Sequence, residues 1–431
     1  DITSHWVAHH TKPYESNITS HKMIIDTIKS NFKIIFFGFV FLFTSSVGQS
    51  FFIGLFNSEI RNELNISHSE FGTIYGVATL CSSLLLIWIG KKIDDFKLVY
   101  YSIFVIVLLS FSAIFFSFVN GVISLLFGIF LLRLSGQGLM SHTSTTAISR
   151  YFNKRRGKAL SIVFLGMSLG EFILPVLIVY LLSIFYWREL WVQISIVVLL
   201  FLPLICIFTI KDIGIESREK DDENNTNQSN LIKSWTRKEV LYDYKFYTIL
   251  PCLLASPFII TGIVINQSFI LESKNWDDYA LAKAFMSYSV FTVLTLFFSG
   301  YLVDKFSSRK LLIYLNFPMI LSLLVLIFFD HSFSAFVFMG LLGSTNGFAN
   351  VIISSLWAEI YGVKYLGSIK ALTVSLMVFS TALGTAVFGF LIDYSYSIEK
   401  ISTICLVYTI ISTVIVAIFA NIYKPQLLNK T

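Results

Sequence analysis

The sequence predicts an all-α polytopic membrane protein of twelve transmembrane helices, arranged as two halves of six. The composition is the first observation: 55% of the 431 residues are hydrophobic, 13% are charged, and the mean hydropathy is +0.74. A soluble domain carries about a quarter charged residues. Apolar runs of about 20 residues recur along the whole chain, each long enough to cross a bilayer as a helix. The short alternating segments typical of membrane strands do not occur.

Twelve apolar segments are predicted to span the membrane, at 33–56, 70–90, 98–119, 121–145, 158–182, 188–210, 246–271, 281–301, 310–330, 333–357, 368–392 and 399–423. An even number of spans places both chain ends on one side. With the N-terminus taken as cytoplasmic, 26 of the 32 Lys and Arg residues fall inside, 5 fall outside and Arg133 lies within a span. Because basic loops stay on the cytoplasmic side, we expect a multi-pass protein of the plasma (inner) membrane with both termini cytoplasmic.

The alternation of polar and apolar segments divides the chain into five parts. Residues 1–32 are expected to form a cytoplasmic, mostly disordered tail, because their first part is polar, rich in His and lacks the apolar core of a signal peptide. The N-terminal six-helix bundle is predicted at 33–210 and the C-terminal bundle at 246–423. Between them, 211–245 is acidic and rich in amides, and is predicted to be a cytoplasmic linker. Residues 424–431 form a cytoplasmic C-terminal tail.

No metal, cofactor or nucleic acid is expected to bind. Cys81, Cys206, Cys252 and Cys405 lie singly in apolar runs without C-x-x-C spacing, and we interpret them as small buried hydrophobic residues. The net charge of +6 is spread over short loops, where basic residues report topology rather than a nucleic-acid surface. The chain lacks a G-x-x-x-x-G-K-[ST] loop, so any transport must draw on an ion gradient or on the gradient of the substrate itself.

The two halves repeat each other in sequence. Six short matches occur in the same order at an offset near 210, which indicates a parallel repeat of two six-helix units. The matches pair G-Q-S-F-F-I (48–53) with N-Q-S-F-I (266–270), G-K-K-I-D-D-F (90–96) with G-Y-L-V-D-K-F-S-S-R-K (300–310), S-G-Q-G (135–138) with S-T-N-G (344–347), Y-x-x-K (151–154) with Y-x-x-K (361–364), K-A-L (158–160) with K-A-L (370–372), and S-L-G-E (168–171) with A-L-G-T (382–385).

This organisation resembles the major facilitator superfamily over the whole length after the tail. The loops after the second and eighth spans are similar to the family's motif G-x-x-x-D-[RK]-x-G-[RK]-[RK], which implies the major facilitator fold and a loop that biases inward against outward states. The residues that match are Gly90, Asp94, Gly300, Asp304, Arg309 and Lys310. The first copy departs from the pattern, with Asp95 where a base is usual. A tight turn with a capping Asp is the alternative interpretation of these loops.

Within the superfamily, the region around the fifth span resembles the monocarboxylate and oxalate–formate transporter group. That group shows Y-F-x-x-R-R-x-x-A-x-G before a G-x-x-x-G, with R-x-x-G-x-G on the fourth helix. The matching residues here are Tyr151, Phe152, Arg155, Arg156, Ala159, Gly166 and Gly170, then Arg133, Gly136 and Gly138. The eighth span lacks the central Asp and Arg of many animal monocarboxylate transporters. The resemblance implies transport of a small organic anion, in particular a monocarboxylate.

Arg133 and Glu171 are the charges expected deep in the membrane. They lie almost equally far from the turn near residue 152, and equal distance along an antiparallel hairpin means equal depth. We predict that they approach within ion-pair distance in at least one state, because a lone cation and a lone anion in hydrocarbon are best kept together. The guanidinium fork fits a carboxylate of either Glu171 or a substrate. Glu171 is the candidate proton carrier, and a purely structural Arg–Glu pair is the alternative.

Polar side chains near the middle of the first, fourth, seventh and tenth spans complete the candidate substrate site, since these helices line the cavity in the family. A buried amide without a partner costs several kcal/mol, so each must face another amide, water or a ligand. The candidate substrate-binding residues are Arg133, Gln49, Gln137, Asn266, Gln267 and Asn346. Hydrogen bonding between helices is the alternative role for Gln49, Gln267 and Asn346.

The predicted function is a secondary active transporter of a small organic anion, working with a proton or a counter-substrate and functioning as a monomer in the lipid bilayer. Proton symport is favoured, and exchange of anions or transport of another small solute is the alternative. A polytopic membrane enzyme would need a catalytic cluster, and His142 near Ser141 and Ser144 has no third partner in the sequence. A sensor with this fold but without transport would need an output domain, and no polar segment is long enough to be one.

Overall fold

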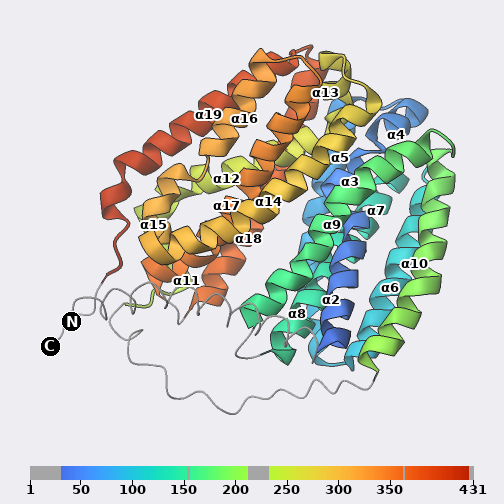
Figure 1. The fold of residues 1–431 in the computed structure, drawn as a ribbon, viewed down its shortest axis with the longest axis horizontal. Helices are drawn as coiled ribbons and strands as arrows, with labels where there is room; N and C mark the ends of the chain where they lie inside the picture. The colour runs from blue at the N-terminus through green and yellow to red at the C-terminus, as the bar shows by residue number, and fades with distance from the viewer. Residues whose placement is uncertain (1–30, 153–155, 212–232, 363–364, 427–431) are drawn as a thin grey trace, which may run out of the picture.

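The computed structural model describes residues 31–152, 156–211, 233–362 and 365–426, with chain positions shown in Figure 1. The described residues are helical throughout, and twelve helices are long and apolar enough to span a membrane, which confirms the predicted number. The chain is an integral, multi-pass membrane protein. The predicted domain boundaries remain predictions, and the tail residues 1–30 and 427–431 lie outside the described part.

The N-terminal half contains six spans, two of which are built from shorter pieces. Its elements are α2 (Phe32–Ser45), η1 (Ser46–Gly48), α3 (Ser50–Gly54), α4 (Asn57–Leu64), α5 (His68–Lys91), η2 (Lys92–Asp94), α6 (Leu98–Ser117), α7 (Val122–Leu132), η3 (Arg133–Met140), α8 (Ser141–Tyr151), α9 (Arg156–Leu182) and α10 (Trp187–Ile210).

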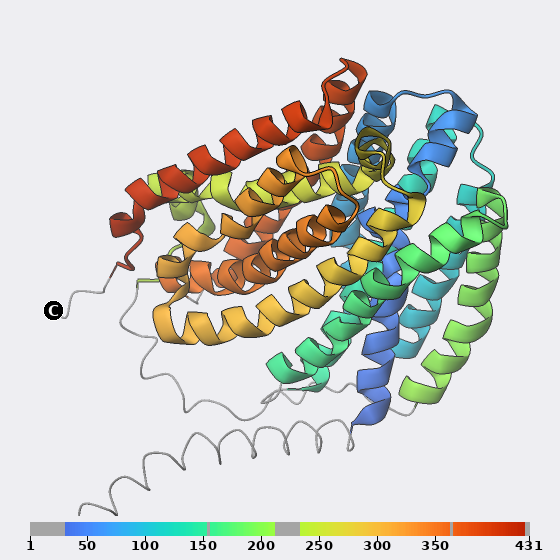
Figure 2. The ribbon, with the colours of Figure 1, turned by 45° about the horizontal axis from the view of Figure 1, so that its top comes forward.

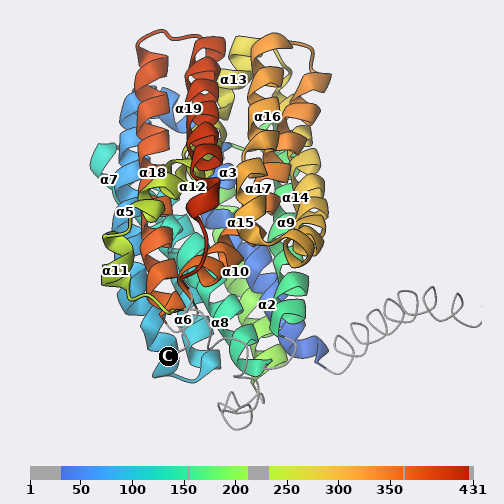
Figure 3. The same cartoon turned by 90° about the vertical axis from the view of Figure 1, so that its left-hand side faces the viewer.

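The C-terminal half repeats this plan after the linker. Its elements are α11 (Arg237–Leu241), α12 (Tyr244–Ile265), α13 (Gln267–Lys274), α14 (Asp278–Phe306), α15 (Ser308–Leu311), η5 (Leu312–Tyr314), α16 (Phe317–Phe328), α17 (Phe333–Tyr361), α18 (Leu366–Asp393), α19 (Ile398–Ile418) and η6 (Ala420–Ile422). The helices run side by side along one direction, as Figure 3 shows. We call the end where α2 begins and α19 ends the terminal face, and the opposite end the far face.

Two related spans are interrupted at related places. The first span breaks at Gln49, whose backbone is extended (φ −80°, ψ 155°), between η1 and α3. The seventh breaks at Asn266 (φ −100°, ψ 29°), between α12 and α13. The predicted spans 33–56 and 246–271 each contain one of these interruptions, which hydropathy alone does not predict. Broken helices are tolerated at membrane depth where the freed backbone groups find partners or line a cavity.

The two halves pack against each other through α5 with α18 and α9 with α14. Small residues allow the close approach of α5 and α18: a side chain added at Gly76 would lie 2.8 Å from the carbonyl oxygen of Ala382. Thr385 Oγ1 also donates to the carbonyl of Gly72 at 3.0 Å. Small residues at a helix contact, with a side-chain hydrogen bond across it, are typical of membrane helix packing.

Contacts between the halves lie toward the far face. Among the described residues, the hydrogen bonds that cross from one half to the other join Asn57 to Ile265, His68 and Ser69 to Asp393, His68 to Asn266, Gln267 to Phe51, Ser289 to Ser168 and Thr385 to Gly72. Figures 1 and 2 show the two bundles approaching each other at that end and leaning apart toward the terminal face. Among the described residues, the hydrogen-bonded contacts between the halves are therefore concentrated toward the far face.

The last part of the predicted linker is folded onto the C-terminal half. The backbone N–H of Trp235 donates to the carbonyl of Tyr361 at 2.9 Å, and that of Lys233 donates to the carbonyl of Gln426 at 2.8 Å. Thr236 and Glu239 form a capping box that starts α11. The stretch therefore links the last residue of α17, Tyr361, to Gln426 at the terminal face. Residues 212–232 of the predicted linker lie outside the described residues.

Candidate functional site

Arg133 lies in a buried position where the first, second and fourth spans meet. Its side chain is 4% exposed, and it is the first residue of the π-helical segment η3. One guanidinium nitrogen, Nη1, donates to the carbonyl of Gly48 at 3.1 Å and lies 3.4 Å from Ser50 Oγ. The guanidinium carbon stands 5.2 Å from the centre of the Tyr75 ring, a cation–π distance. π-Helical segments within α-helices are frequent at functional sites.

The local sequence explains why the first and fourth spans come so close at this point. A side chain added at Gly136 would lie 2.6 Å from the backbone nitrogen of Gly48, so two glycines are needed where the break in the first span faces η3. The break in turn leaves the Gly48 carbonyl free to accept from Arg133. The candidate site is therefore built from a helix break, a π-helical segment and two facing glycines.

Arg133 has no acidic partner among the described residues. No carboxylate of the described part lies within ion-pair distance of its guanidinium, and its Nε atom is buried without a hydrogen-bond acceptor. Its protein partners are one carbonyl, one hydroxyl and one aromatic face, none of which carries a negative charge. No described residue compensates the positive charge in this conformation.

The predicted ion pair between Arg133 and Glu171 is not formed in this conformation. Arg133 points to the first and second spans, whereas Glu171 lies on α9 at the contact between the halves. Next to it, Ser289 Oγ of α14 donates to the carbonyl of Ser168 at 2.6 Å, and Tyr288 of α14 lies within electrostatic range of the Glu171 carboxyl. Two residues can lie at equal depth in the membrane while their side chains point in different directions around their helix axes. The pair remains a prediction for another state.

The candidate amides fall into two groups. Asn266 and Gln267 are 1% and 3% exposed and belong to the far-face closure: Asn266 Oδ1 lies 3.3 Å from His68 Nδ1, and Gln267 Nε2 donates to the Phe51 carbonyl at 3.4 Å. In this conformation they act as contacts between the halves. Gln49 is half-buried, with Nε2 3.6 Å from the Met167 sulfur.

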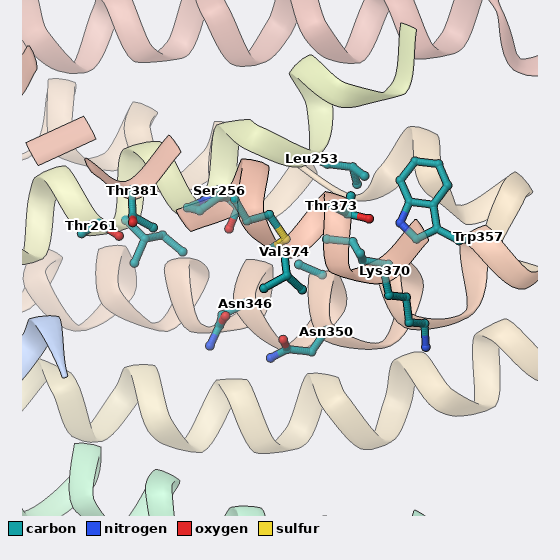
Figure 4. Close-up of a pocket in the computed structure, with 15 residues that line it drawn as sticks. Leu253, Ser256, Thr261, Asn346, Asn350, Trp357, Lys370, Thr373, Val374 and Thr381 are labelled. Carbon is teal, nitrogen blue, oxygen red and sulfur yellow. The ribbon is translucent and has the colours of Figure 1, made fainter. Parts of the chain in front are cut away.

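Asn346 lies elsewhere, in a cavity of about 380 Å³ within the C-terminal half, between α12, α17 and α18 (Figure 4). Sequence reasoning missed the other polar residues of this cavity, which are Asn350, Lys370, Ser256, Thr261, Thr373 and Thr381. The sequence signals for Asn350 and Lys370 are the i, i+4 spacing of the two asparagines and the repeated K-A-L. Gln137 is half-buried on η3, and the structure does not bring it into this cavity.

The motif loops are partly described. Gly90 lies against His142, whose Nε2 is 3.0 Å from the Gly90 carbonyl oxygen. Arg309 Nε is 3.7 Å from Glu359 Oε2, and Arg309 Nη1 donates to the Tyr423 carbonyl at 3.4 Å. Gly300 has open space beside its Cα and Lys310 is exposed. The side chains of Asp94 and Asp304 lie outside the described part, so the gating role of these loops stays a prediction.

The family profile described as Major Facilitator Superfamily matches the chain over residues 38–286 and 249–431. The chain belongs to the Major Facilitator Superfamily. This membership and the twelve-helix fold make it a transporter of the membrane rather than an enzyme. The profile matches the superfamily as a whole and identifies no group within it.

Solved structures of other superfamily transporters share this fold. A bacterial homologue of the human lysosomal transporter Spinster, in an inward-facing and occupied conformation, is 14% identical with a TM-score of 0.64, covering 92% of this chain and 95% of the other. The nucleoside transporter NupG is 13% identical with a TM-score of 0.66, covering 91% of this chain and all of the other. At these identities the likeness concerns the fold alone. No curated protein matches this transporter by sequence.

Proposed function

We propose that this transporter moves a small organic anion, in particular a monocarboxylate, across the plasma (inner) membrane by alternating access, with both termini cytoplasmic. The observation that carries the proposal is the buried guanidinium of Arg133, which has no carboxylate partner among the described residues. With the termini inside, the terminal face, toward which the two bundles lean apart, is the cytoplasmic side.

The energetics of a buried charge support an anionic substrate. An isolated charge in a low-dielectric interior costs several kcal/mol unless it is paired. Arg133 keeps its Nε free, and a guanidinium forms two parallel hydrogen bonds with a carboxylate. Ser50 and Tyr75, which hydrogen-bond to each other at 2.8 Å, stand beside it and can contact the bound anion. A substrate carboxylate bound here would neutralise the positive charge of Arg133, which no described carboxylate neutralises.

Glu171 is the proposed proton carrier. It has no ion-pair partner among the described residues and lies where α9 meets α14, an interface that must rearrange when the halves rock. A carboxyl group in such a place changes its surroundings between the two states, so it can take up a proton in one and release it in the other. Proton symport is therefore favoured over exchange.

Uptake into proteoliposomes tests the function. Purified protein is offered radiolabelled lactate, pyruvate, acetate and oxalate, with and without an inward proton gradient and with unlabelled anion inside. We expect uptake of at least one monocarboxylate, accelerated by the gradient. Arg133→Lys keeps the charge but loses the fork, and should lower uptake by about tenfold or more, whereas the exposed Lys97→Met should not. Transport of neutral solutes with no anion uptake would refute the proposal, and uptake driven only by internal anion would establish an exchanger.

A further inference from the structure

The cavity of the C-terminal half is lined by Asn346, one of the candidate substrate-binding residues, and by Asn350 and Lys370, which the transport site above does not use. Figure 4 shows the polar ends of Asn346, Asn350 and Lys370 along one edge of this cavity. Lys370 is half-buried, and in the described part of the chain no carboxylate lies within ion-pair distance of its ammonium group. The two amide side chains likewise have no hydrogen-bond partner among the described residues. Most of the remaining lining is apolar.

The position of these groups argues against a purely structural role. Lys370 is close to the start of α18 at Leu366, and a cation near a helix N-terminus is opposed by the helix dipole. No acidic residue in the first turn of α18 offsets it. Asn346 and Asn350 are four residues apart on α17 and so lie on one face, one turn above the other. Asn346 and Lys370 are half-buried and Asn350 is exposed. None of the three side chains has a hydrogen-bond or ion-pair partner among the described residues, so water or a ligand in the cavity can bind to them.

The cavity is separate from Arg133. Lys370 is four residues from the start of α18, about 6 Å along the helix from the terminal face. Arg133 is 18 residues from the end of α8 at Tyr151, about 27 Å from the same face. The difference of about 20 Å is too large for one small carboxylate to touch both cations. The two positive groups also belong to different halves.

We propose that Lys370, Asn350 and Asn346 form a second binding site for small carboxylates, a receiving site through which the anion passes between the cytoplasm and Arg133. The inference rests on the proposed function and adds a second substrate contact to it. Lys370 attracts the carboxylate as a point charge without the fork geometry of an arginine, which suits brief binding. The amide of Asn350 and then that of Asn346, one helical turn deeper, donate hydrogen bonds to the anion as it moves inward.

A sided transport measurement tests the receiving site. Initial rates of lactate and pyruvate transport are measured in inside-out and right-side-out membrane vesicles, which present opposite faces to the medium. Lys370→Met should raise the apparent KM at the terminal face by about tenfold, with the KM at the far face and the maximal rate changed by less than about twofold. Lys370→Arg should restore most of the affinity. Lys238→Met, at an exposed lysine of α11 at the same end of the C-terminal half, is the matched control.

A binding measurement that does not need transport separates this inference from the proposed function. Val374 lines the same cavity and is 57% exposed, so the fluorescence of a Val374→Trp protein, taken as the difference from the wild type, reports on it. Iodide, an anionic quencher, should quench this tryptophan several-fold less when Lys370→Met is added, whereas the neutral quencher acrylamide should act equally on both. If iodide quenching is unchanged, or if the KM values at the two faces change alike, the receiving site is refuted. If no carboxylate is transported but quenching depends on Lys370, the anion site stands and the substrate proposal fails.

Discussion

Glu63 and Lys274 occupy equivalent places in the two halves, 211 residues apart, and each forms an ion pair. The acidic residue of the pair stands at this place in the N-terminal half, and the basic residue stands there in the C-terminal half. Glu63 accepts from Arg188 at 2.6 Å, and Lys274 donates to Glu399 at 3.0 Å. Arg188 and Glu399 are also 211 residues apart. In each half, the ion pair joins the segment that ends the first span to the start of the sixth span, at the far face. The repeat therefore extends to packing contacts even where the charges have been exchanged.

Glu63 gives a pH-dependent prediction. Burial alone would raise the pKa of Glu63, but hydrogen bonds from Arg188, Tyr186 and Trp187 outweigh it and hold the pKa below its ordinary value. A lowered pKa in the folded state means that the contribution to stability is present above the unfolded pKa and is lost as pH falls through the folded one. The melting temperature should therefore fall on acidification below about pH 4 by more in the wild type than in Glu63→Gln. Parallel curves for the two proteins would contradict this.

A second prediction concerns the closure of the far face. The carboxylate of Asp393 accepts from the backbone N–H groups of His68 and Ser69, at 3.2 and 2.8 Å, and so caps α5 from the other half. Loss of a cap costs about 0.5–2 kcal/mol, which corresponds to a shift of roughly 2- to 30-fold in a two-state equilibrium. Asp393→Ala should move the protein toward the state open at the far face.

Thiol accessibility measures that shift. Ser58 lines a far-face cavity of about 580 Å³ between the halves, and Ser58→Cys in a protein without native cysteines can be labelled with a membrane-impermeant maleimide. Asp393→Ala should speed the labelling severalfold. Asp277→Ala is the matched control, because Asp277 caps α14 within one half. Equal labelling rates in the two variants would show that the cap does not hold the far face closed.

A third prediction follows from the glycine contact beneath Arg133. The methyl group of Gly136→Ala would lie 2.6 Å from the Gly48 nitrogen, so the first and fourth spans must move apart. Overpacking of this kind costs about 1–3 kcal/mol. We expect a lower melting temperature and a large loss of uptake, whereas Gly121→Ala, with no atom within 4 Å of the added methyl group, should be nearly neutral. Thermal unfolding in detergent and uptake in proteoliposomes are the measurements.

The spans could be predicted from hydropathy, and the repeat from the order of the matching motifs. The directions in which side chains point around each helix could not be predicted from the sequence. Counting from the turn gave Arg133 and Glu171 the same depth, but the π-helical segment and the break at Gln49 decide that Arg133 faces Gly48 instead. Asn266 illustrates a second limit: whether it lines a cavity or joins the halves depends on the conformation. Lys370 was missed because a basic residue near a span end has a sufficient explanation in topology.

The last prediction distinguishes a functional from a structural role of Arg133 and Glu171. Glu171→Gln should remove the dependence of uptake on the proton gradient while sparing exchange of the anion, because a neutral amide cannot release a proton. If the two residues served only as a buried pair in another state, losing one partner would cost about 3–5 kcal/mol, and replacing both with apolar residues would restore stability. Arg133→Met with Glu171→Met then tests the pair directly. We expect the double variant to fold at near wild-type yield without anion uptake, since Arg133 has no acidic partner among the described residues in this conformation. Restoration of both yield and uptake would show that the pair is only structural, and that the anion binds elsewhere.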